Sequence, residues 1–161
     1  MQAFRKILVP TDFGPPARQA LDLACEIADK FDSTVTILHV YTPPVVPYME
    51  PFPFPLDDFM TAAQVVLDRE VARARTMHKR VSGELGGGAA WREIVDRVVD
   101  EGHDLVVMGT HGRRGVSRVL VGSVADRVVR TCPVPVLTVS GPDLGEHKRS
   151  AAAIPVESRP R

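Results

Sequence analysis

One stretch decides the fold: Leu105, Val106, Val107, Met108, Gly109, Thr110, His111, Gly112. Its four consecutive apolar residues predict a strand that is buried on both faces of a parallel sheet. The strand runs directly into a loop that carries two glycines. In open α/β sheets, ligands bind beyond the carboxyl ends of the strands. The stretch therefore predicts both a parallel sheet and a candidate ligand loop.

The rest of the chain alternates strand and helix patterns around this stretch. Further strands are predicted at residues 7–9, 35–40 and 134–139, and helices at residues 15–31, 57–80, 91–101 and 123–130. Such alternation predicts a three-layer α/β fold, with an open parallel sheet, helices on both faces and right-handed crossovers. Residues 82–88 contain three consecutive glycines and only one large apolar residue, so we expect a loop there.

The composition is that of an ordinary globular domain. The 161 residues fit one core, and 44% of them are apolar and 25% charged. Twenty basic residues balance twenty acidic ones, so we expect neither a nucleic-acid nor a membrane partner. The N-terminal residues lack the apolar stretch of a signal peptide, which predicts a cytoplasmic location. Cys25 and Cys132 have no metal-ligand spacing and are expected to be buried thiols.

The glycine loop leads into a predicted helix start. Gly112 is followed, after nine residues, by Gly122 and Ser123. The run from Ser123 to Asp126 resembles a capping box. Backbone NH groups and the helix dipole at such a start attract phosphate oxygens, and glycine lets the backbone approach them closely. The loop therefore predicts a phosphate site.

The pattern Gly-x-x-Gly, nine residues, Gly-Ser resembles the ATP signature of the universal stress protein family. Residues 7–12, 104–109 and 132–136 are similar to other segments typical of that family. The resemblance covers about residues 3–140 and implies the adenine nucleotide alpha hydrolase-like form of the three-layer fold. Residues 1–140 are then one universal stress protein domain, and the proline-containing, charged residues 141–161 are expected to be a disordered tail.

The resemblance also implies which residues hold ATP. Adenosine would lie against Asp12 and the backbone near Val40, with Pro10, Thr11 and Met108 beside it. The triphosphate would lie over the glycine loop and the following helix start, on Gly109, Gly112, Arg113, Gly122, Ser123 and Val124. A magnesium or manganese ion would arrive with the nucleotide. From the sequence alone, Asp12 has a second interpretation, as the residue that begins the first helix or its turn.

Other charged side chains near the loop keep two interpretations. Arg114 and Arg118 either pair with phosphates or form an exposed basic loop. His111 is expected to face solvent, and the remaining histidines share no metal-ligand spacing. We therefore predict no metal site built by the protein.

The chain departs from the family pattern in one place. Family members have a strand where this chain has residues 82–88, so we expect a sheet that lacks one edge strand beside the second strand. That change lies on the adenosine side of the implied site. The proline-rich residues 41–55 are predicted to form a long loop, which either covers that side or is a plain connector.

Three functions compete. The first is an ATP-binding regulatory protein of the stress response, the second a slow ATPase or phosphotransferase, and the third a dimeric stress scaffold that binds no nucleotide. No Walker lysine follows the glycines, and no Asp or Glu lies between Gly109 and Ser123, so fast turnover is disfavoured and no catalytic residue is predicted. The intact glycine pattern favours the first function.

The final predicted strand, residues 134–139, indicates an interface with a second copy of the chain. Pro133 and Pro135 remove backbone donors from its first half, which confines the strand to an edge of the sheet. An apolar edge invites pairing with another chain. The resemblance implies an antiparallel twofold homodimer through Val136–Val139.

Overall fold

The computed structural model describes residues 4–42, 56–110 and 122–140. In chain order the elements are β1 (Lys6–Pro10), α1 (Pro15–Phe31), β2 (Thr34–Tyr41), α2 (Leu56–Arg75), β3 (Val81–Gly87), α3 (Ala90–Glu101), β4 (Leu105–Gly109), α4 (Ser123–Thr131) and β5 (Val136–Val139). The tail expected at residues 141–161 and most of the proline-rich segment lie outside the described residues.

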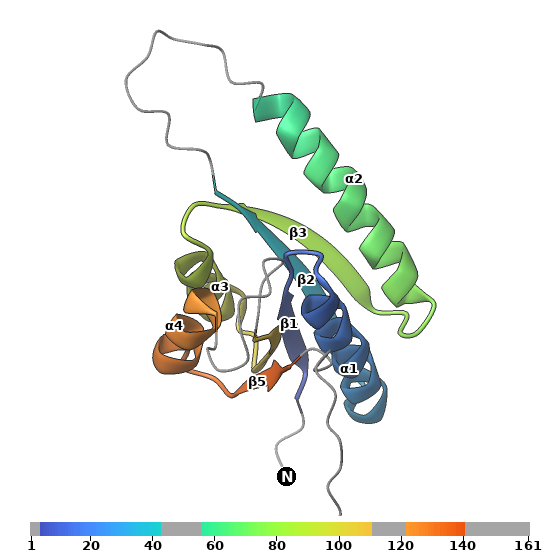
Figure 1. Ribbon diagram of the computed structural model, residues 1–161. Helices are drawn as coiled ribbons and strands as arrows, with labels where there is room; N and C mark the ends of the chain where they lie inside the picture. The colour runs from blue at the N-terminus through green and yellow to red at the C-terminus, as the bar shows by residue number, and fades with distance from the viewer. Residues whose placement is uncertain (1–3, 43–55, 111–121, 141–161) are drawn as a thin grey trace, which may run out of the picture.

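The five strands form one parallel sheet in the order β3-β2-β1-β4-β5. Figure 1 shows α1 and α2 on one face of this sheet and α3 and α4 on the other. The predicted three-layer α/β fold is therefore confirmed. The chain proceeds from β1 outward through β2 to β3, and then returns to the other side of β1 with β4 and β5. The strand order thus reverses between β1 and β4.

Residues of β1 show why this sheet is buried on both faces. Ile7, Leu8 and Val9 are each fully buried, and successive side chains of a strand point to opposite faces. Ile7 and Val9 pack in the core cluster under α1 and α2, and Leu8 packs in the cluster under α3 and α4. An uninterrupted apolar run is thus what a central parallel strand requires.

The expectation of a missing edge strand is wrong. β3 pairs in parallel with β2 over its whole length, from Val35 opposite Val81 to Tyr41 opposite Gly87. The glycines that predicted a loop serve helix packing instead. A Cβ on Gly83 would lie 2.7 Å from Cγ2 of Val71 in α2, and one on Gly86 would lie 2.6 Å from Cγ of Glu93 in α3.

Two element ends also differ from the predictions. α2 ends at Arg75 rather than near residue 80. The following turn buries His78, whose Nδ1 lies 2.6 Å from Oδ1 of Asp29 and whose Nε2 lies 2.9 Å from the carbonyl oxygen of Ser33. These two contacts hold the turn against the end of α1, and β3 follows directly after it. β5 begins at Val136, after the prolines, and lies at the edge of the sheet as predicted.

Candidate functional site

A pocket of about 280 Å³ opens at the carboxyl ends of β1, β2 and β4. This is the point at which the strand order reverses, the usual ligand position in open α/β sheets. Helices α1, α3 and α4 complete its walls. The described lining residues are Pro10, Thr11, Asp12, Ala17, Leu38, His39, Val40, Ala90, Ile94, Met108, Gly109, Thr110, Gly122, Ser123, Val124 and Ala125.

The site predicted from the sequence converges on this pocket. Nine of its residues line it, namely Pro10, Thr11, Asp12, Val40, Met108, Gly109, Gly122, Ser123 and Val124. The other two, Gly112 and Arg113, lie outside the described residues, as do His111, Arg114 and Arg118. Residues more than a hundred positions apart in the chain are thus brought to one cavity by the sheet order.

The turn between β1 and α1 carries the one carboxylate among the described lining residues, that of Asp12. Its Oδ1 accepts a hydrogen bond of 2.9 Å from the amide of Gly14, the N-cap of α1. The hydroxyl oxygen of Thr11 accepts one of 3.0 Å from the amide of Phe13. Asp12 therefore shapes the turn and also lines the pocket, so its two interpretations are compatible.

The N-terminus of α4 forms another wall, but without the predicted capping box. Gly122 is the N-cap, and no side chain caps the helix. Ser123 is already the first helical residue, and the amide of Asp126 donates to the carbonyl of Gly122 over 2.9 Å. The capping-box prediction is wrong because that motif needs Ser123 as the N-cap, whereas the helix begins one residue earlier, at Ser123 itself. The first-turn NH groups have no acceptor within the helix, which suits an anion.

Gly109 has a packing role that the sequence did not reveal. A Cβ at this position would lie 2.9 Å from the carbonyl carbon of Pro16 and 3.0 Å from the amide nitrogen of Ala17. Glycine at the end of β4 therefore lets the start of α1 approach the sheet, which closes the floor of the pocket.

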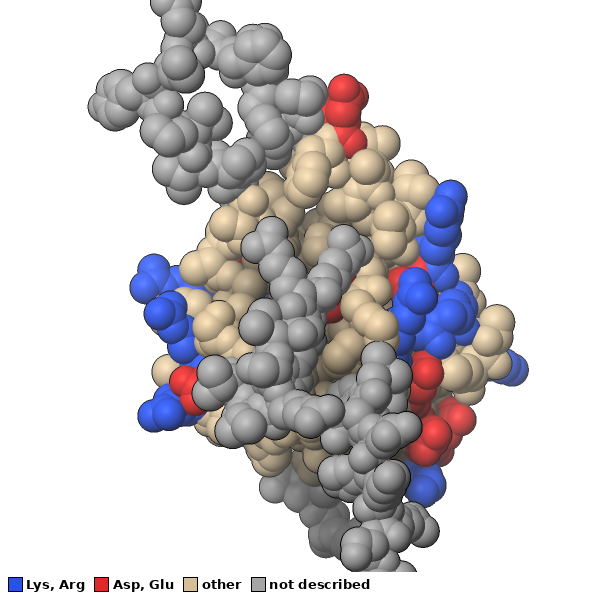
Figure 2. All heavy atoms as spheres, in the orientation of Figure 1, with Lys and Arg blue, Asp and Glu red and all other residues tan. Residues whose placement is uncertain are grey.

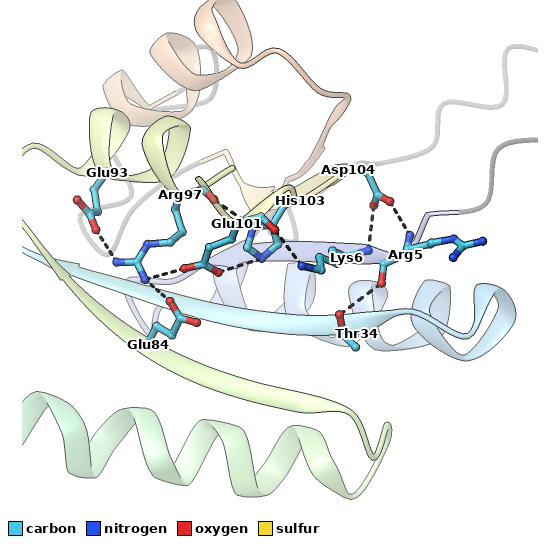
Figure 3. Close-up of polar contacts among 9 residues, drawn as sticks. All are labelled: Arg5, Lys6, Thr34, Glu84, Glu93, Arg97, Glu101, His103 and Asp104. Atoms are coloured by element: carbon cyan, nitrogen blue, oxygen red, sulfur yellow. Dashed lines mark hydrogen bonds and ion pairs between the residues drawn. The ribbon is translucent and has the colours of Figure 1, made fainter. Parts of the chain in front are cut away.

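The α3 wall is held by an ionic cluster around Arg97, drawn in Figure 3. The guanidinium donates to Glu93 over 2.7 Å and to Glu101 over 3.1 Å within α3, and it also pairs with Glu84 of β3. These bonds, led by the one to Glu93, raise the pKa of Arg97. The cluster fixes α3 against the edge strand, and α3 in turn presents Ala90 and Ile94 to the pocket.

Part of the pocket lining carries no signal in the sequence. Leu38, Ala90 and Ile94 line the pocket, as does His39 of β2. Leu38 and Ile94 belong to the buried core cluster on the α3 and α4 side. Their strand and helix periodicity marks them as core, and only the sheet order places them beside a cavity.

Charge around the described surface is mixed. Figure 2 shows basic and acidic side chains on both flanks of one face. In residues 4–42, 56–110 and 122–140, no group of three His, Cys, Asp or Glu side chains is arranged to hold a metal. No helix in the described part of the chain is long and apolar enough to cross a bilayer.

Comparisons with known proteins identify the family. The sequence model of the universal stress protein family matches residues 3–140. A universal stress protein of Methanocaldococcus jannaschii is 32% identical over 147 residues, which is 86% of this chain and 84% of that protein.

Solved structures agree with this match. The universal stress protein UspA of Lactobacillus plantarum superimposes with a TM-score of 0.75 at 25% identity, covering 86% of this chain and 99% of that one. A universal stress protein of Archaeoglobus fulgidus, solved in complex with dAMP, has a TM-score of 0.63 at 21% identity, covering 86% of this chain and 99% of that one. On its sequence and its fold, the chain belongs to the universal stress protein family.

Proposed function

We propose that this protein binds ATP in the pocket at the strand reversal and acts as a nucleotide-responsive regulator in the stress response. The observation that carries the proposal is the convergence of Gly109, Asp12 and the α4 N-terminus at Gly122 on one cavity. The lining of this cavity combines aliphatic side chains with hydroxyl and carboxylate groups, which suits the base and phosphate ends of a nucleotide.

The base would lie against the aliphatic part of the lining. Leu38, Val40 and Ile94 offer a wall of aliphatic side chains there. Burial of an aromatic base against such a wall is favourable because apolar surface leaves water. Asp12, at the mouth of the same wall, is suited to accept hydrogen bonds from ribose hydroxyls.

The phosphates would lie at the start of α4. Gly122 has φ −56° and ψ 148°, so it extends the chain up to the helix and leaves no side chain over the first-turn NH groups. Those groups and the helix dipole favour an anion. Gly112 and Arg113, on the adjoining segment, are proposed to complete this half of the site.

The related protein of Archaeoglobus fulgidus supports an adenine nucleotide as the ligand class, because its structure was solved with dAMP. The triphosphate in this chain is our proposal from the glycine pattern. A magnesium or manganese ion would be bound mainly by the phosphates, since Asp12 is the single carboxylate among the described lining residues. That ion would screen the phosphate charges.

Slow or absent hydrolysis is part of the proposal. Phosphoryl transfer needs a group that positions the attacking oxygen and cations that stabilise the developing charge. Residues 110–122 contain arginines but no Asp or Glu to position the attacking oxygen and no Walker-type lysine. We therefore propose a nucleotide-binding regulator rather than an enzyme. We further propose that it acts in the cytoplasm, as a homodimer through β5.

Native mass spectrometry of freshly purified protein tests the proposal. We expect each chain to carry an added mass equal to ATP, or to take it up when ATP is supplied. A bare mass under both conditions would leave the dimeric scaffold without nucleotide as the better account. Denaturation and chromatography of the released ligand identify which nucleotide was bound.

A further inference from the structure

His39 makes an unusual contact at the end of β2. Its Nδ1 lies 2.8 Å from the carbonyl oxygen of Thr11, in the turn that follows β1. A carbonyl oxygen can only accept a hydrogen bond, so Nδ1 carries the proton and donates it. The imidazole is thus a cross-strand tie between β2 and the turn that presents Asp12.

The orientation of His39 separates it from the apolar pocket wall. Side chains alternate along β2, and Leu38 and Val40 pack in the cluster beside α3 and α4. His39 therefore points toward the other face of the sheet, where its ring meets Phe13. It also lines the pocket, beside Thr11 of the turn.

The turn needs support from outside because its backbone is strained. Phe13 has φ 64°, in the left-handed region that a bulky residue rarely adopts. The ring of His39 lies against the Phe13 ring, with centroids 4.4 Å apart and an interplanar angle of 33°. A strained backbone conformation persists only where surrounding groups hold it. His39 contacts the turn at two points, the carbonyl oxygen of Thr11 and the ring of Phe13.

The same turn sets the position of Asp12. The amide of Thr11 donates to the carbonyl of Leu38 over 2.8 Å, and Asp12 Oδ1 accepts from Gly14. His39 adds the bond to the Thr11 carbonyl, which begins the peptide unit leading to Asp12. β2 thus holds the turn at two adjacent backbone groups, one through its main chain and one through a side chain.

We propose that His39 is a positioning residue for nucleotide binding: it locks the 11–14 turn so that the Asp12 carboxylate faces the ribose. The proposal rests on the proposed function for its ligand. It assigns His39 no direct role in holding the base or the phosphates. Its effect passes through the Thr11 carbonyl and the Phe13 ring.

Two substitutions separate the hydrogen bond from the volume of the ring. His39→Asn keeps a donor near the place of Nδ1, and His39→Leu has similar bulk without a donor. Tyr41→Phe, at the same strand end but outside the pocket lining, is the control. Each variant is first checked for an unchanged unfolding midpoint. ATP affinity is then measured by titration calorimetry, and exchange of the Phe13 and Gly14 amides is measured without nucleotide.

We expect His39→Leu to weaken ATP binding about tenfold, the equivalent of ~1.4 kcal/mol, as loss of one well-placed hydrogen bond predicts. His39→Asn and Tyr41→Phe should stay close to wild type. Amide exchange at Phe13 and Gly14 should accelerate in His39→Leu alone. Wild-type affinity in His39→Leu, or an equal loss in His39→Asn, would overturn the positioning role.

The two readouts distinguish failure here from failure of the proposed function. If the wild-type protein binds no ATP, the nucleotide part of both proposals is overturned together. The exchange measurement still decides whether His39 locks the turn. Unchanged exchange in His39→Leu would overturn that part, whatever the affinity shows.

Discussion

The backbone amide of Gly122 donates a hydrogen bond of 2.6 Å to the carbonyl oxygen of Thr110. This bond joins the residue after β4 to the N-cap of α4, so the segment between them leaves and returns at one point beside the pocket. Eleven residues separate the two in sequence. The first and last glycines of the pattern, Gly109 and Gly122, therefore lie close together at the carboxyl end of β4.

Gly109 is predicted to be essential for packing as well as for the site. Gly109→Ala would bring a methyl group to 2.9 Å from the backbone of Pro16 and should lower the free energy of unfolding by about 1–3 kcal/mol. Gly87→Ala is the matched control, because its methyl group meets the movable end of the Tyr41 side chain. Urea unfolding that showed equal losses for both would contradict the close approach of β4 and α1.

The Arg97 cluster is predicted to hold α3 on the sheet edge. Arg97→Met leaves Glu84, Glu93 and Glu101 without their shared cation and should destabilise the protein by about 1.5–3 kcal/mol. Arg130→Met removes an exposed pair with Asp126 and should cost less than about 1 kcal/mol.

The loss of folding stability caused by Arg97→Met should not vary between pH 6 and 9. The pKa of Arg97 is raised, so its stabilisation is complete below the ordinary arginine range and is lost only above it. Thermal unfolding across this range is the measurement. An effect of Arg97→Met no larger than that of Arg130→Met would show that the cluster is not a structural tie.

We predict that the buried thiol of Cys25 makes the folded protein less stable at high pH. Burial raises the pKa of its thiol from 9.0 to about 11, so the folded protein disfavours the thiolate. A raised pKa gives stability that is complete below pH 9 and is lost as pH rises toward 11, at about 1.4 kcal/mol per pH unit. Cys25→Ala should lack this pH-dependent loss of stability, and Cys132→Ala should retain it. Parallel pH curves for wild type and Cys25→Ala would contradict the burial of this thiol.

The proposed dimer can be tested at the open edge of β5. The carbonyls of Pro135 and Val139 accept bonds from the amides of Val106 in β4 and of Thr110 just after it. Backbone groups alternate along a strand, so the amide of Thr138 faces the open edge. Thr138→Pro should therefore weaken dimerisation and leave the β4 ladder intact. Leu137→Pro would instead break a bond to β4.

Sedimentation at micromolar concentration is the measurement for the dimer. Val139→Lys serves as a second variant, because it would force a charge into an apolar contact. We expect a wild-type dimer and weaker association in both variants. A monomeric wild type, or a Thr138→Pro dimer as tight as wild type, would rule out this interface.

Much of the fold could be predicted from the sequence, because β1 and β4 carry continuous apolar runs and β2 is rich in β-branched residues. β3 could not be predicted, because glycines such as Gly83 and Gly86 are typical of loops. In the structure, their lack of a side chain makes room for α2 and α3. That requirement arises from tertiary contacts, which a local pattern does not contain. The capping-box prediction was wrong for a related reason, because residue types alone do not say which residue is the N-cap.

The candidate site divides in the same way. The motif residues of β1, β4 and α4 could be predicted because their order along the chain is characteristic. Leu38 and Ile94 could not, because their patterns are those of core residues and only the β1–β4 reversal places them beside a cavity. His39 carries no local signal for its bond to Thr11.

Calorimetric titration of ATP into wild type and Gly122→Val tests the central claim most directly. The φ of −56° and ψ of 148° at Gly122 are open to any residue, so valine adds bulk at the phosphate end without backbone strain. Ala72→Val, on the exposed surface of α2, controls for the substitution itself. We expect saturable ATP binding in wild type and Ala72→Val, and a loss of affinity of about tenfold or more in Gly122→Val. Equal ATP affinity in all three proteins would contradict the central claim.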